Sequence, residues 1–357
     1  MDLSDLLQPT DVGLYCSAGD FYIDPWRPVD RAVITHAHAD HACRGCAKYL
    51  TSRAGENVLR ARSDKDAVIE TAEYGQTLSI NGVTVSLHPA GHILGSSQVR
   101  VEHRGLIGVV SGDYKVEPDA TCGAFEPVKC HLFVSESTFG LPIYRWPSQA
   151  EIFESIRSWW KANQDDGKAS VLFAYALGKA QRLIAGLGND LGPIYTHGAV
   201  ERMNRAYRDS GVNLPETAYA ASAGSADWSK ALIVAPPSSQ GTPWLRRFGP
   251  MSTGFASGWM RIRGARRRRS VDRGFVLSDH ADWPGLLDAI NATGADETWL
   301  THGYTAVVAK WLREQGKEAK TITTRYEGER DDASAEGDAE SAEDPAPLFA
   351  GETEAAS

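Results

Sequence analysis

The chain has 357 residues, 42% of them hydrophobic, and a formal net charge of −9. This length allows a large hydrophobic core, and we expect the chain to divide into two domains. Because no apolar run reaches the roughly 20 residues that cross a bilayer, and no signal-like segment opens the chain, we expect a soluble cytoplasmic protein without a membrane partner.

The first predicted element that bears on chemistry is a short apolar strand over residues 21–23, which ends in Asp24. An Asp at this point either caps the turn before Pro25 or orients a histidine from behind. The sequence leaves both roles open.

A predicted buried strand over residues 32–34 leads directly into three imidazoles and one carboxylate. Because side chains alternate along an extended backbone, His36 and His38 can reach one ion, while Asp40 and His41, turning into the next helix, face a second. Imidazole and carboxylate suit Zn²⁺, and Mn²⁺ is a rival because oxygen ligands also suit harder cations. The alternative is a histidine-rich turn without metal.

The cysteines give little support for a structural zinc site. Five is an odd number, and in a chain without a secretory signal we expect reduced thiols. Cys43 and Cys46 have the spacing of a ligand pair, but no second cysteine pair follows at zinc-finger spacing. A zinc finger is therefore the weaker interpretation.

Two hairpins are predicted between residues 76 and 113. Apolar residues alternate on either side of Asn81-Gly82, and again on either side of Arg104-Gly105. The first hairpin ends before His92, and the second ends before Asp113. Both side chains therefore lie on loops held by a rigid β frame, where residues distant in sequence can gather.

The pattern changes after an apolar strand that ends in Glu136. From residue 145 to residue 270, predicted strands alternate with predicted helices, which is typical of a parallel sheet with crossover connections. We therefore expect an inserted α/β domain. Trp159 and Trp160 fall at helical spacing and are expected in its core rather than on a base-stacking surface.

Two basic segments of this insertion are candidate phosphate contacts. Lys179 and Arg182 open a predicted helix, whose N-terminus favours anions. Seven arginines lie between residues 261 and 273, opposed only by Asp272, and guanidinium groups bind phosphate bidentately. We expect Lys179, Arg182, Arg261 and Arg263 to contact nucleic acid. A solvated surface, or the acidic tail folded back on the arginines, is the alternative.

After the insertion, an apolar strand presents Asp279-His280, and a predicted helix leads to a strand that ends in His302. A final helix over residues 307–312 is expected to pack on the first domain. His197 stands in a context similar to that of His302, but it lies inside the insertion and is left out of the expected site.

The last segment, residues 327–357, is an acidic tail. It holds eleven acidic residues and one basic residue, so its net charge is −10 and the rest of the chain carries +1. Because this composition lacks apolar periodicity, we expect the tail to be disordered. The body of the protein is nearly neutral, so the net charge does not argue against a polyanionic partner.

The histidines and carboxylates, taken in order, resemble those of a known family. His36-x-His38-x-Asp40-His41 resembles the signature of the metallo-β-lactamase superfamily. Residues 178–182 are similar to a stretch near the start of the insertion in its β-CASP branch, whose known members are nucleases of DNA and RNA. The remaining candidate site residues follow in the order found in that branch: His92, Asp113, Glu136, His280 and His302.

The resemblance implies an α/β fold. An αββα metallo-β-lactamase sandwich would comprise residues 1–144 and 271–326, interrupted by a Rossmann-like β-CASP domain at residues 145–270 and followed by the tail. It also implies two divalent metal ions, Zn or Mn. The ligands implied are His36, His38 and His92 for the first ion, Asp40, His41 and His302 for the second, and Asp113 between the two.

Such a site suits phosphodiester hydrolysis. By resemblance, His280 is the acid that protonates the leaving group, and Glu136 holds its imidazole in the useful tautomer. Asp40 is expected to serve catalysis as well as the metal. Asp24 would orient one of the ligand histidines.

The substrate remains open between several alternatives. A histidine at the position of His302 is typical of RNA-processing members, whereas the compact insertion and single acidic tail resemble bacterial ligase-associated DNA exonucleases. We favour a DNA exonuclease of DNA repair, with a DNA ligase or a helicase as implied partner, over an RNA-processing endo- or exonuclease. The insertion, the arginines and the His280–Glu136 pair oppose a small-molecule metallohydrolase, and the complete ligand set opposes a non-catalytic scaffold.

Overall fold

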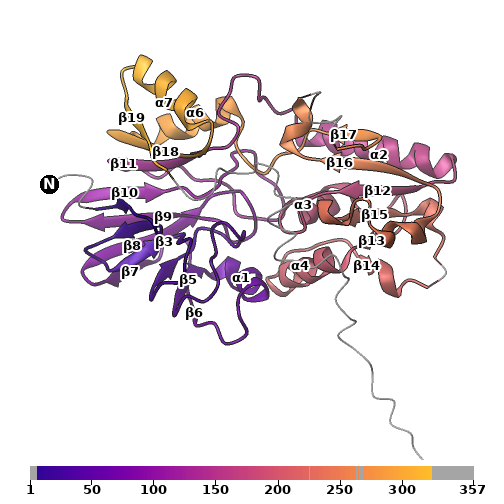
Figure 1. Cartoon of the computed structure of the whole chain (residues 1–357), viewed down its shortest axis with the longest axis horizontal. Helices are drawn as coiled ribbons and strands as arrows, with labels where there is room; N and C mark the ends of the chain where they lie inside the picture. Colours follow the sequence, from indigo (N-terminus) through magenta and orange to yellow (C-terminus); the bar gives the residue numbers. More distant parts are fainter. Residues whose placement is uncertain (1–5, 225, 263, 265–268, 324–357) are drawn as a thin grey trace, which may run out of the picture.

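The structure is a computed structural model that describes residues 6–224, 226–262, 264 and 269–323. These residues form three sheets in two halves (Figure 1). Two sheets and the helices α1 (Glu56–Arg62), α6 (Trp283–Thr293) and α7 (Thr305–Glu314) build the first half. The third sheet and the helices α2 (Gln149–Asp165), α3 (Lys179–Leu187) and α4 (Gly198–Asp209) build the second.

Each sheet draws its strands largely from one part of the chain. The first sheet, in spatial order, contains β1 (Gln8–Pro9), β2 (Leu14–Cys16), β3 (Phe21–Ile23), β4 (Ala32–Val33), β5 (Tyr49–Ser52) and β6 (Ile69–Ala72). The second contains β19 (Glu318–Thr321), β18 (Glu297–Gly303), β11 (Leu132–Ser137), β10 (Leu106–Val110), β9 (Ser97–His103), β8 (Val83–Pro89) and β7 (Thr77–Ile80). The third contains β14 (Ala218–Tyr219), β13 (Ile194–Thr196), β15 (Leu232–Ala235), β12 (Ala169–Phe173), β16 (Met251–Ala256) and β17 (Arg273–Phe275).

The two sheets of the first half pack face to face. Phe21 and Val33 of the first sheet meet Val85 and Trp299 of the second in one buried apolar cluster. Helices α6 and α7 cover the outer face of the second sheet, and α1 covers the outer face of the first. The order helix, sheet, sheet, helix confirms the predicted αββα sandwich.

Both predicted hairpins are present. Strands β7 and β8 pair antiparallel with Ile80 opposite Val83, and β9 and β10 pair antiparallel around the second turn. Asn81 (φ 48°) and Gly82 (φ 83°) both have positive φ, as a tight two-residue hairpin turn requires. The Asn-Gly pair in the sequence therefore predicted this hairpin turn correctly.

The third sheet is parallel at each of its pairings, as the alternation of strands and helices predicted. Trp159 and Trp160 of α2 pack in the core between this sheet and its helices, as expected. None of the helices among the described residues is long and apolar enough to cross a membrane.

Two expectations about local structure were wrong. The histidine cluster does not turn into a helix, because residues 34–48 form turns and α1 begins only at Glu56. The insertion was expected to end at residue 270, but β17 pairs with β16 of the third sheet. That sheet therefore runs to Phe275, and the chain returns to the first half only afterwards.

Candidate metal centre

The candidate site residues lie at one edge of the sandwich because the strands before them run in the same direction. In the second sheet, β8, β10, β11 and β18 share one direction, since β9 is antiparallel to both of its neighbours and the other pairings are parallel. Residues after the carboxyl ends of such strands meet at one edge. His92 and Asp113 follow β8 and β10, and Glu136 and His302 are the second-last residues of β11 and β18.

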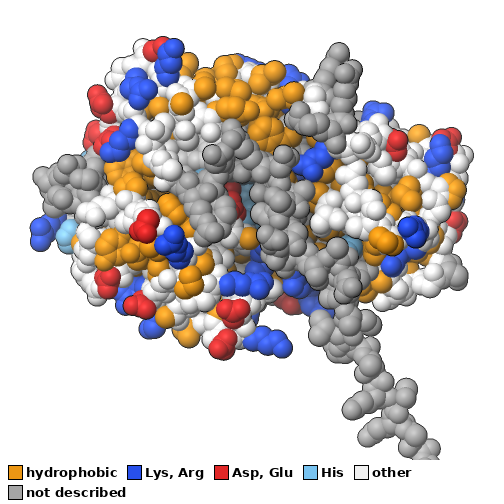
Figure 2. All heavy atoms as spheres, in the orientation of Figure 1, with side chains coloured by type: hydrophobic (Ala, Val, Ile, Leu, Met, Phe, Trp, Pro, Cys, Tyr) orange, Lys and Arg blue, Asp and Glu red, His pale blue; other side chains and the backbone are white. Residues whose placement is uncertain are grey.

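The first sheet contributes the N-terminal cluster in the same way. Strands β3 and β4 are parallel, and they are followed by Asp24 and by the segment that carries His36, His38 and His41. In Figure 2 an acidic and a histidine side chain are visible between the two halves of the molecule. The structure thus brings together residues that lie hundreds of positions apart in the sequence.

The first group of candidate ligands consists of His36, His38, His92 and Asp113, whose ligand atoms all lie within 4.8 Å of one another. His38 Nδ1 lies 3.1 Å from His36 Nε2 and 3.1 Å from His92 Nε2. Asp113 Oδ2 lies 3.6 Å from His36 Nε2. Four donor atoms that converge on one point in this way are arranged as the ligands of a single cation.

Hydrogen bonds on the far side of these rings fix their tautomers. His92 Nδ1 donates to the carbonyl oxygen of Asp279 at 2.7 Å, and His38 Nε2 lies 3.3 Å from the carbonyl oxygen of Leu177. A carbonyl can only accept, so these nitrogens carry the protons. The opposite nitrogens, His92 Nε2 and His38 Nδ1, therefore present lone pairs to the centre.

The second group consists of His41, Asp113 and His302. Asp113 Oδ2 lies 3.5 Å from His41 Nε2, and Asp113 Oδ1 lies 3.6 Å from His302 Nδ1. Asp40 Oδ2 lies 3.7 Å from His41 Nε2, so Asp40 borders this group. Asp113 belongs to both groups, and also to a third with Glu136 and His280, and could bridge two ions.

Two buried atoms of the second group test whether a cation fits here. His41 Nε2 and Asp113 Oδ1 have no hydrogen-bond partner among the described residues, although both atoms are buried. A buried polar atom without a partner is costly, and a divalent cation between an imidazole nitrogen and a carboxylate oxygen removes that cost. The residues present therefore fit two divalent ions.

Asp24 supports the second group from behind. Its carboxylate accepts a hydrogen bond from His41 Nδ1 at 2.7 Å and another from the backbone N–H of Thr35 at 2.8 Å. The backbone of Asp24 (φ 45°) and that of His302 (φ 56°) adopt a conformation that L residues rarely take. Strained backbone of this kind concentrates at functional sites.

The electrostatics of the two groups differ. Burial lowers the pKa of His36, His38 and His92, so these imidazoles are neutral, as metal ligands must be. Burial also disfavours charge on His41, but the carboxylates around it, Asp113 first, raise its pKa well above the ordinary value. A cation bound here would take the place of that proton.

His280 and Glu136 form a pair beside the first group. His280 Nδ1 lies 2.9 Å from Glu136 Oε2 and 3.0 Å from Oε1, and the backbone N–H of Tyr114 donates to the same carboxylate at 2.7 Å. The ring centroids of His280 and His92 are 4.7 Å apart. Because the carboxylate holds Nδ1, any proton transfer to a substrate would use Nε2.

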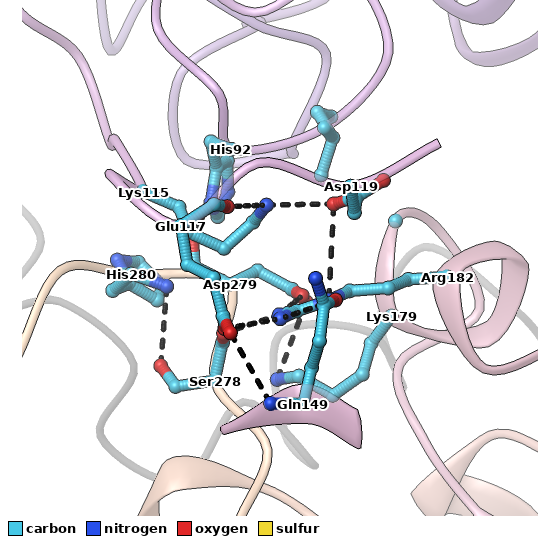
Figure 3. A network of polar contacts seen from close by, with 12 residues as sticks. His92, Lys115, Glu117, Asp119, Gln149, Lys179, Arg182, Ser278, Asp279 and His280 are labelled. Atoms are coloured by element: carbon cyan, nitrogen blue, oxygen red, sulfur yellow. Dashed lines mark hydrogen bonds and ion pairs between the residues drawn. The ribbon is translucent and has the colours of Figure 1, made fainter. Parts of the chain in front are cut away.

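Lys179 and Arg182 were expected to contact phosphate, and this prediction was wrong. Both are buried, at 0% and 3% exposure, between α3 and the first half. Arg182 donates to the carbonyl oxygen of Ser278 at 2.6 Å and to Asp279 Oδ1 at 3.1 Å, while Lys179 Nζ lies 3.6 Å from Asp279 Oδ2 (Figure 3). Both cations are already neutralised by protein carboxylates.

The same network extends to the loop after Asp113. Arg182 reaches Glu117 at 3.1 Å, and Lys115 Nζ lies 2.6 Å from Asp119 Oδ2 (Figure 3). Lys115, Glu117 and Asp119 were not singled out in the sequence. The sequence shows that Asp279 directly precedes His280. It does not show that Asp279 pairs with a cation about a hundred positions away. The network joins the insertion to the segment that carries His280.

The remaining residues considered in the sequence belong to neither ligand group. Arg261 is exposed, and its Nε donates to the carbonyl oxygen of Ile143 at 3.4 Å. Arg263 lies outside the described residues. His197 caps α4 instead of joining the centre. Cys43 donates to the carbonyl of Arg44, and the candidate metal groups of the described part include no cysteine.

The chain is similar to several known proteins. A probable DNA ligase from Opitutus terrae is 31% identical over 316 residues, which cover 87% of this chain and 30% of the ligase. Endoribonuclease YSH1 from Yarrowia lipolytica is 26% identical over 190 residues, covering 44% of this chain and 23% of that protein. The chain therefore spans less than a third of the length of either relative.

A solved structure shares the fold. A protein of unknown function from Enterococcus faecalis matches with a TM-score of 0.55 and 11% identity, over 84% of this chain and 80% of that one. At this identity the similarity concerns the fold alone. No family model matches the chain.

Proposed function

This chain belongs to the β-CASP branch of the metallo-β-lactamase superfamily, and from that premise we propose that it hydrolyses phosphodiester bonds of nucleic acid. The observation that carries the proposal is the pair of ligand groups that share Asp113, with the His280–Glu136 pair beside them. The ligand groups alone would suit many hydrolytic reactions. The additional acid suits a substrate with a poor leaving group.

Each ligand would have one role. His36, His38 and His92 would hold a first divalent ion, and Asp40, His41 and His302 a second, with Asp113 between them. Two such ions, Zn²⁺ or Mn²⁺, would supply an activated water and neutralise charge on the phosphate. Asp24 keeps His41 oriented, and the carbonyl oxygen of Asp279 does the same for His92.

His280 would protonate the leaving oxygen. An alkoxide leaves slowly without a proton, and a positioned acid speeds such a step by roughly 10²–10⁴-fold. Glu136 holds His280 Nδ1, which stabilises the imidazolium before the transfer and fixes the direction of Nε2. The same pair has no evident task in the hydrolysis of an activated ester.

We favour DNA as the substrate and exonucleolytic action as the mode. The support is the similarity to a probable DNA ligase, which covers 87% of this chain. On this proposal the protein trims DNA ends during repair, with a DNA ligase or a helicase as partner. The second candidate is RNA processing, favoured by the similarity to Endoribonuclease YSH1 and by the presence of His302 beside Asp113.

The test is incubation of the purified chain with end-labelled single- and double-stranded DNA and RNA, in Mn²⁺ or Zn²⁺. Stepwise shortening of DNA from one end is the expected result, and internal cuts in RNA would select the second candidate. The His280→Ala variant controls for contaminating nucleases. Hydrolysis of small esters without cleavage of any nucleic acid would overturn the proposal.

A further inference from the structure

We infer that the aromatic and apolar rim beside His280, together with Arg261, binds the nucleotide next to the scissile phosphate. Trp259 and Ile143 would contact the base of that nucleotide, and Arg261 would contact its phosphate. This inference rests on the proposed function and says which part of a nucleic acid the site recognises.

The rim is built on a continuous cluster of five rings from three separate segments. Phe139 lies at the centre: its ring centroid is 4.8 Å from that of Tyr144, 4.8 Å from Trp146 and 4.9 Å from Trp259. Tyr304 joins through Tyr144, with hydroxyl oxygens 3.4 Å apart. The cluster thus links the segment after β11, the turn Gly258–Arg261 of the insertion, and the residue before α7.

The cluster touches the residues proposed for catalysis. The indole N–H of Trp146 donates to the carbonyl oxygen of His280 at 2.9 Å, and the rings of Phe139 and His280 are 5.9 Å apart. Tyr304 follows His302 by two positions, and its backbone N–H donates to Ser137 at 2.9 Å. A group bound on this rim is therefore next to the acid and to a proposed metal ligand.

The rings of the cluster differ in exposure: two are buried, and the others lie at an accessible rim. Phe139 and Tyr144 are buried, at 1% and 0% exposure, so they support the other rings. Trp259, Trp146 and Tyr304 are half-buried, and Ile143 is 54% exposed. Figure 2 shows hydrophobic side chains gathered at the top of the view, near the boundary between the two halves. An exposed apolar surface beside a strongly polar centre indicates a binding role.

Arg261 adds a cation to the same rim. It is exposed, and its Nε donates to the carbonyl oxygen of Ile143 at 3.4 Å, which holds the guanidinium beside the most exposed apolar residue of the segment. A guanidinium next to an aromatic and apolar face matches a nucleotide, in which a charged phosphate adjoins a flat base. A small phosphodiester without a base would use neither part.

The test compares two substrates: a labelled oligonucleotide and methyl 4-nitrophenyl phosphate, in which a methyl group stands where the nucleoside opposite the leaving group would be. We expect Trp259→Ala to lower kcat/KM for the oligonucleotide by roughly 10- to 100-fold, the usual cost of losing one base–aromatic stack, and to lower it much less for the small diester. Trp259→Phe keeps a ring and should recover most of the loss. Activity on the small diester also reports whether the variant folds.

Arg261→Ala gives a second, independent readout, because this side chain is exposed and belongs to none of the five rings. We expect KM for the oligonucleotide to rise, and the dependence of log KM on log salt to become shallower by about one phosphate contact. Arg104→Ala, at an exposed side chain in the hairpin turn between β9 and β10, at the end of these strands away from the site, is the matched control and should leave both unchanged.

An abasic nucleotide beside the scissile phosphate completes the test. It should slow the wild type about as much as Trp259→Ala does, and should slow that variant no further. Equal losses on both substrates, or an unchanged salt dependence in Arg261→Ala, would overturn the inference. If the wild type hydrolyses the small diester but no oligonucleotide, the proposed function fails instead.

Discussion

Arg182→Met removes the guanidinium that joins α3 to the segment carrying His280, while keeping an apolar side chain in its place. Removing one partner of a buried ion pair costs about 3–5 kcal/mol, because the other charge stays buried without compensation. Lys179 remains 3.6 Å from Asp279, and Glu117, at 36% side-chain exposure, can turn to solvent. We therefore expect a loss at the lower end, about 3 kcal/mol of unfolding free energy.

The assay is chemical denaturation with a chelator present, so that metal affinity does not enter the comparison. Arg182→Lys keeps the charge and serves as the conservative control. In an Asp279→Asn background, Arg182→Met should lower the unfolding free energy clearly less. The side chain that then loses Arg182 is a neutral amide instead of a carboxylate. A loss below about 0.5 kcal/mol, typical of surface substitutions, or an equal loss in both backgrounds, would show that the Arg182–Asp279 pair does not hold these segments together.

Three further predictions concern the centre and its surroundings. His280→Ala should retain both metal ions by elemental analysis yet lose roughly 10²–10⁴-fold in turnover, and loss of a metal ion would contradict its role as acid. A chelator should lower the thermal unfolding midpoint, and Zn²⁺ or Mn²⁺ should restore it, because ligands of the folded state stabilise it. Burial alone would raise the pKa of Asp119, but Lys115 and Thr121 hold it below the ordinary value. Its stabilising effect is therefore full above about pH 4 and is lost as the pH falls below that value, so wild type and Asp119→Asn should differ in stability at pH 7 and converge in acid.

The ligand groups could be predicted because their signals are local. Each ligand stands on a strand, or in the loop after a strand, whose apolar pattern is visible in the sequence, and parallel strands deliver their ends to one edge. The hairpin turn at Asn81-Gly82 fixes the register that brings His92 there. Short-range patterns were therefore enough to predict most of the fold and the strands that position the proposed ligands.

The functions of Lys179 and Arg182 could not be predicted in the same way. A helix that opens with two cations has the pattern of a surface anion site, and its N-terminus gives no sign of burial. The partners that neutralise these cations, Glu117, Asp119 and Asp279, come from loops about 60 to 100 positions away. Only the packing of the insertion against the first half brings these charges together.

The carbonyl oxygen that orients His38 was hidden for a related reason. It belongs to Leu177, just before α3, and a backbone carbonyl has no signature in the sequence. The late end of the third sheet at Phe275 was missed because Arg273-Gly274-Phe275 is a short edge strand with little alternation. The contact of His38 with Leu177 and the end of the third sheet at Phe275 both depend on contacts between distant segments, rather than on local propensity.

The measurement that tests the two-metal centre most directly is the metal content of the chain after equilibration with Zn²⁺ or Mn²⁺ and removal of excess ion. We expect two ions in the wild type and one in His302→Ala, because that variant loses a ligand of the second group only. A wild type that binds a single ion, or a His302→Ala variant that keeps two, would contradict this expectation.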